Sequence, residues 1–181
     1  SVTANTKHNI LLGDNHTVVS GSQNAILGGY NHAVCGERNA IIGGQTNSVC
    51  GVITNSAIIG GSQNDIIESV SYSTILGGQA NSITSAAYAT ILGGSGNIIE
   101  TTGDNFHLHA GKMNLTKGNV TGSYLFGESN TATHSNVHIF GKQIASSGSN
   151  VVYVDNLHVE SAISAATAHV TQVNTTQEVF T

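Results

Sequence analysis

The sequence has no proline and no tryptophan, and only 8% of its 181 residues are charged, against roughly 25% in an ordinary globular domain. Lysine and arginine number five together, and the formal net charge is -5. With no basic footprint, we expect no nucleic-acid partner. The apolar runs fall far short of the roughly 18 residues of a membrane helix, so we expect no membrane insertion by this segment. Two cysteines are too few for the disulfide framework of a small secreted domain.

What the sequence does contain is a repeat built around glycine. A small residue, two aliphatic residues and two glycines recur five times. Counting Gly13, the first glycines stand at positions 13, 28, 43, 60, 77 and 93, which are 15, 15, 17, 17 and 16 residues apart. A nearly fixed period of this kind indicates a repeat architecture. The glycine pairs that mark the structural repeat are Gly28 and Gly29, Gly43 and Gly44, Gly60 and Gly61, Gly77 and Gly78, and Gly93 and Gly94.

Each repeat has a second half, in which an asparagine introduces a shorter apolar segment, as in Asn47-Ser48-Val49 and Asn64-Asp65-Ile66. The unit therefore reads as strand, glycine bend, strand, polar bend, which is too short for a helical repeat. Glycine and asparagine both tolerate the left-handed bends that such corners need. Stacked coils would place isoleucine on isoleucine and asparagine on asparagine, about 4.8 Å apart. The sequence predicts an all-β solenoid.

A coil with two short strands encloses little core. We therefore expect one apolar face of the solenoid to be left open to water by a single chain. Association of several chains along a common axis would bury that face.

The repeats resemble the head repeats of trimeric autotransporter adhesins and of related phage tail fibres, from about Ile10 to Asp155. The resemblance implies a homotrimer of left-handed parallel β-rolls. It also implies a structural and attachment role in a fibre that contacts a host-cell surface glycan or protein. The leading interpretation is a tail-fibre segment of a virion, and the alternative is the head of a bacterial surface adhesin that binds matrix or another cell.

Two segments are expected on this basis. Residues 1–155 would form the β-roll, with regular repeats at about 22–103 and degenerate ones at 104–155. Residues 156–181 lack glycine and would form a neck or stalk, for which a trimeric coiled coil and interwound strands are both open.

The candidate metal ligands are His107 and His109, because two imidazoles at i and i+2 point to the same side of a strand. Aligned through Gly111, they would take the places of Thr90 and Leu92. On a face lining a threefold axis, three chains would present six imidazoles, which suits one Fe, Ni, Co or Zn ion per trimer. The competing interpretation is two polar surface residues. His138 would give an axial ring with only three ligands.

Other chemical features indicate structural roles. Cys35 and Cys50 are one repeat apart, so they should stack, and a ladder of free thiols is favoured over a disulfide. The acidic residues are dispersed over different bends, with no pair at the separation a glycosidase needs, so we do not expect an enzyme. Tyrosines on bends are the natural candidates for carbohydrate contact, but the sequence predicts no receptor pocket. These tyrosines are Tyr30, Tyr72, Tyr88 and Tyr124.

Overall fold

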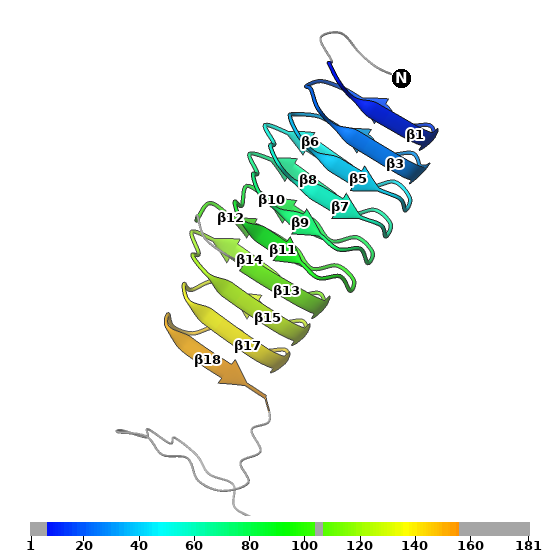
Figure 1. Ribbon diagram of the computed structural model, residues 1–181. Coiled ribbons are helices and arrows are strands. Elements are labelled where there is room, and N and C mark those ends of the chain that lie inside the picture. Colours follow the sequence, from blue (N-terminus) through cyan, green and yellow to red (C-terminus); the bar gives the residue numbers. More distant parts are fainter. Residues whose placement is uncertain (1–6, 104–106, 156–181) are drawn as a thin grey trace, which may run out of the picture.

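The computed structural model describes residues 7–103 and 107–155, and the regular structure in these ranges is entirely β-strand. The strands stack in parallel as a β-solenoid of about 9 turns, which forms a straight rod with β1 (Ile10–Asp14) at one end and β18 (Val151–Val154) at the other (Figure 1). The predicted all-β solenoid is confirmed. In the described ranges no helix is long and apolar enough to cross a membrane. The expected neck at 156–181 lies outside the described residues.

Two parallel sheets form two sides of every coil. The ten-strand sheet has the order β1, β3 (Ala25–Tyr30), β5 (Ala40–Ile42), β7 (Ala57–Ile59), β9 (Thr74–Ile75), β11 (Ala89–Ile91), β13 (His107–Lys112), β15 (Ser123–Glu128), β17 (Val137–Lys142) and β18. The eight-strand sheet comprises β2 (Thr17–Val18), β4 (Ala33–Val34), β6 (Ser48–Gly51), β8 (Asp65–Glu68), β10 (Ser82–Thr84), β12 (Ile98–Thr101), β14 (Leu115–Gly118) and β16 (Thr131–Ala132). The third side consists of the irregular segments that lead from each strand of the eight-strand sheet to the next strand of the ten-strand sheet, for example 69–73 and 85–88.

The core consists of side chains that stack on their equivalents in the next coil. In the ten-strand sheet Ile26, Ile41, Ile58, Ile75 and Ile91 are in register and fully buried, as the repeat predicted. The eight-strand sheet adds a second buried stack, which begins Val18, Val34, Val49, Ile66, Ile83 and Ile99. The third side contributes Ile53, Val70, Ala86 and Val120. Because every coil adds the same contacts, rod length is set by the number of repeats.

A buried asparagine ladder closes one corner of the core. The Oδ1 of Asn47 accepts the backbone N–H of Asn64 at 3.0 Å, and the Oδ1 of Asn64 accepts that of Asn81 at 3.0 Å. The side-chain amide of Asn81 donates to the carbonyl oxygens of Gly77 and Gly94 at 3.1 and 3.2 Å. The ladder therefore satisfies backbone groups that the glycine bends leave unpaired.

The sequence suggested that these asparagines adopt the left-handed backbone at the corner, and this was wrong for Asn47 and Asn64. The positive φ at this corner belongs to the preceding residue, as at Thr46 and Gln63 with φ of 52° and 57°. Asn47 and Asn64 themselves are selected for their buried hydrogen bonds rather than for a left-handed backbone.

Cys35 and Cys50 stack as expected but form a disulfide between adjacent coils, so the predicted free-thiol ladder was wrong. Their Cα atoms are 4.7 Å apart, which lies within the range that a disulfide spans. The spacing between neighbouring coils at this position is therefore short enough for the bond.

Candidate functional site

His107 and His109 on β13 both point into the core of the coil, where each is fully buried. The register pairs His107 with Ala89 and His109 with Ile91, not with Thr90 and Leu92 as the glycine alignment predicted. The error is one residue, and a shift of one residue along a strand moves a side chain to the opposite face. It arises because the earlier coils have a glycine pair where this coil has only Gly111.

Two hydroxyl side chains complete a polar layer with these rings. His107 Nδ1 lies 2.8 Å from Ser123 Oγ, and His109 Nε2 lies 2.8 Å from Thr116 Oγ1. The two hydroxyl oxygens are 2.7 Å apart, so one continuous chain of hydrogen bonds joins the two imidazoles. The remaining ring nitrogens, His107 Nε2 and His109 Nδ1, are buried and have no hydrogen-bond partner among the residues that the structure describes.

This polar layer interrupts the apolar core. Before it lies the large cluster that ends at Ile91 and Ile99, and after it lies a smaller cluster that includes Leu125 and Ile139. His109 stands between Ile91 and Leu125 in the stack of the ten-strand sheet. A neutral polar layer of this kind is tolerated only because its members bond to one another.

Burial favours the neutral form of both histidines. Burial lowers the pKa of His109 to about 3, and the neighbouring His107 adds to this effect. Burial likewise lowers the pKa of His107. Neutral imidazole is the form that binds metals.

The predicted axial metal site needs these rings on an outer face of the chain, where copies of the chain could meet. Both rings lie inside the coil, with one nitrogen of each held by a hydroxyl group. Within one copy of the described ranges, no group of three or more His, Cys, Asp or Glu side chains is placed to hold a metal ion. Binding of Fe, Ni, Co or Zn by His107 and His109 stays a prediction.

A different part of the molecule has the properties of an interface, namely the outer face of the ten-strand sheet. Two rows of side chains run along it from β1 to β18, and neither row contains Asp, Glu, Lys or Arg. The first row is Ile10, Ala25, Ala40, Ala57, Thr74, Thr90, Leu108, Tyr124, His138 and Val152. The second row is Leu12, Leu27, Ile42, Ile59, Leu76, Leu92, Ala110, Phe126, Phe140 and Val154.

Most of the second row is exposed, with Leu12, Leu27, Ile42, Ile59, Leu76, Leu92, Phe140 and Val154 between 40% and 58% accessible. The outer face of the eight-strand sheet differs, since it carries Asp65, Glu100 and Lys117. The expected open apolar face is thus present, and it belongs to one sheet only.

Aromatic residues gather at the C-terminal end of this face. Phe126 stacks on Phe140 with ring centroids 5.4 Å apart, and the ring centroids of Tyr124 and His138 are 4.5 Å apart. His138 therefore lies on the apolar face, whereas the favoured pair His107 and His109 does not.

No model of a known protein family matches the sequence, and no curated protein matches it significantly.

Proposed function

We propose that this chain is a structural and attachment segment of a homotrimeric fibre, a tail-fibre segment of a phage or phage-like particle that contributes to binding a host surface. The rod shape, the repeat and the resemblance to adhesin heads and tail fibres support this proposal (Figure 1). The same resemblance is the basis for a left-handed coil and for a location in the virion.

The observation that carries the proposal is the pair of uncharged rows on the outer face of the ten-strand sheet. Its two rows cover ten rungs, a length of about 43 Å at about 4.8 Å per step. Soluble monomers rarely leave a continuous apolar surface of this extent open to water. Burial against other copies of the same chain would remove it from water at every rung, which favours self-association along the whole rod.

Parallel association of identical chains fits the repeat geometry. Around a cyclic axis parallel to the rod, each strand of the sheet meets the equivalent strands of the other chains. Small residues such as Ala40 would then face small residues, and aromatic residues such as Phe140 would face aromatic ones. The number three comes from the resemblance.

The native mass of the purified chain tests this proposal. We expect a mass of three chains for the unaltered protein and of one chain for the double variant Ile59→Lys and Leu76→Lys, which places charge in the second row. The matched control is Ser82→Lys on the outer face of the eight-strand sheet, which should stay trimeric. A monomeric unaltered protein would contradict the trimer, and a trimeric double variant would contradict the proposed face.

One observation favours the second candidate, a bacterial surface adhesin. The disulfide between Cys35 and Cys50 suits an oxidising compartment, which a secreted protein meets during folding and a cytoplasmically assembled particle does not. Non-reducing peptide mapping of the natural material separates the two. A disulfide in protein from the cell envelope supports the adhesin, and reduced cysteines in protein from particles support the tail fibre.

A further inference from the structure

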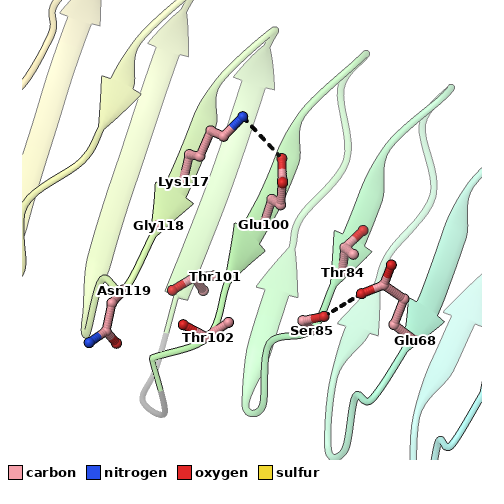
Figure 2. Close-up of a pocket in the computed structure, with 9 residues that line it drawn as sticks. All are labelled: Glu68, Thr84, Ser85, Glu100, Thr101, Thr102, Lys117, Gly118 and Asn119. Carbon is pink, nitrogen blue, oxygen red and sulfur yellow. Dashed lines mark hydrogen bonds and ion pairs between the residues drawn. The ribbon is translucent and has the colours of Figure 1, made fainter.

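A groove crosses the rod on the side away from the two apolar rows, where the eight-strand sheet meets the third side. It has a volume of about 390 Å³, which lies within the range of small-molecule sites. Figure 2 shows that its side chains come from four successive coils. The polar groups that define it are Glu68, Ser85, Glu100, Thr102, Lys117 and Asn119.

The hollow coincides with a change in coil length. The paired residues Ile75 and Ile91 are 16 positions apart, as are His109 and Leu125, whereas Ile91 and His109 are 18 apart. The long coil carries Thr101 and Thr102, which lie in the middle of the groove in Figure 2. Thr101 is buried, and its Oγ1 donates to the carbonyl oxygen of Val120 at 2.9 Å, which fixes this part of the backbone.

Each charged group of the groove has a polar or charged neighbour. Ser85 Oγ donates to Glu68 Oε2 at 2.5 Å, and Lys117 Nζ lies 3.9 Å from Glu100 Oε2. Figure 2 marks both pairs with dashed lines. Glu100 is neutralised by Lys117, while Glu68 has a hydroxyl partner and no cation within ion-pair distance among the described residues. Counted over the described lining residues, the groove therefore has an excess of one negative charge.

The lining selects for a polyhydroxylated ligand. Carboxylates, hydroxyls and the Asn119 amide offer both acceptors and donors, and an apolar molecule would leave these groups desolvated and unpaired. The excess negative charge disfavours anionic ligands. We infer that this groove binds a segment of a neutral or amino-sugar polysaccharide, and this inference rests on the proposal that the fibre attaches to a cell surface.

The same side of the rod offers an aromatic surface. Tyr72 lies in the third-side segment that follows Glu68, Tyr88 lies in the one that begins at Ser85, and both residues are more than half exposed. Their rings stack with centroids 5.2 Å apart and an angle of 4° between the planes. Exposed tyrosines combine an apolar body with a polar hydroxyl, which suits contact with a sugar chain leaving the groove. In a trimer, three such grooves would act together.

Titration calorimetry with three hexasaccharides tests the inference: chitohexaose, which is neutral, its fully de-N-acetylated form, which is cationic, and hexagalacturonate, which is anionic. We expect the first two to bind and the third not to bind. The double variant Thr102→Val and Asn119→Ala should weaken binding by about tenfold, since it removes two hydrogen-bonding groups. Glu68→Gln should weaken binding of the cationic sugar more than binding of the neutral one.

The matched control is Glu128→Gln, which removes the same charge at a corner outside the groove and should leave binding unchanged. Absence of binding to both chito-oligosaccharides, equal binding of the anionic sugar, or undiminished binding by the double variant would each overturn the inference. The native mass of the same samples reports on the fibre separately. A trimer that binds no sugar would contradict only the proposed role of the groove. A monomer that binds sugar would contradict only the proposed trimeric fibre.

Discussion

His32 Nδ1 accepts a hydrogen bond from the backbone N–H of Asn47 at 3.1 Å. In the next coil Asn47 Oδ1 accepts the equivalent hydrogen bond from the backbone N–H of Asn64 at 3.0 Å. His16 does the same for His32 at 3.2 Å, and the two rings stack with centroids 5.0 Å apart. Two buried histidines therefore continue the asparagine ladder to the first coils. A histidine does so only while Nδ1 is unprotonated, because a protonated Nδ1 cannot accept a hydrogen bond.

The double variant His16→Asn and His32→Asn should resist mild acid better than the unaltered protein. Burial lowers the pKa of His32, and the neighbouring His16 lowers it further. The unfolded chain therefore binds more protons than the fold below about pH 6.5, and stability falls as the pH drops through that point. Thermal unfolding of both proteins between pH 7 and pH 4.5 measures the difference. His8→Asn, which removes an exposed histidine, is the control, and equal acid sensitivity in all three proteins would contradict the prediction.

His109→Leu should remove a second source of acid sensitivity in the middle of the rod. Since burial lowers the pKa of His109 to about 3, the fold excludes a proton that the unfolded chain takes up below about pH 6.5. Stability is then lost by about 1.4 kcal/mol for each pH unit between about 6.5 and 3. Leucine fits the position because Leu125 occupies the next rung, and Thr116 keeps its bond to Ser123. Urea unfolding at pH 7, 5.5 and 4 gives the slope, and an unchanged slope in the variant would show that His109 is not responsible.

The position of this histidine shows how far the sequence alone could lead. The period, the strands, the isoleucine stack and the open apolar face all follow from a motif that recurs with little change. The inward placement of His109 does not follow from the glycine pairs, because Gly111 can be matched with either Gly93 or Gly94. The later repeats contain the missing information: Leu125 and Ile139 each precede a single glycine by two positions, and both are buried. Counting His109 from Gly111 in the same way places it inside.

Other features depend on geometry that a repeat motif does not encode. The disulfide follows from the distance between adjacent coils at Cys35 and Cys50 rather than from their spacing in the sequence. The groove is lined by side chains from four coils, one of which is longer than its neighbours, so no single repeat predicts it.

Reduction of the disulfide should destabilise the rod. The bond closes a loop of 15 residues, and restricting the unfolded chain to this extent contributes about 3 kcal/mol in the chain-entropy model. Urea unfolding with and without a reductant should show a shift of this size for the unaltered protein. The variant Cys35→Ser and Cys50→Ser is the control and should not respond to the reductant. A response in the variant, or none in the unaltered protein, would contradict a stabilising role for the bond.

Neighbouring glycines of one pair should differ sharply in their tolerance of alanine. Gly60 and Gly61 have similar φ values of 76° and 77°, so alanine at either position carries the left-handed strain of about 1 to 2 kcal/mol. A Cβ on Gly60 would meet nothing within 4 Å, whereas one on Gly61 would lie 2.3 Å from the carbonyl oxygen of Gly78 in the next coil.

That oxygen belongs to the backbone and cannot move without opening the stack, so Gly61→Ala should destabilise the rod by at least about 2 kcal/mol more than Gly60→Ala. Urea unfolding of the two variants side by side measures this difference, since the substitution and the backbone strain are matched. Equal destabilisation would mean that the left-handed backbone alone requires the glycine pair and that contact between coils has no part in it.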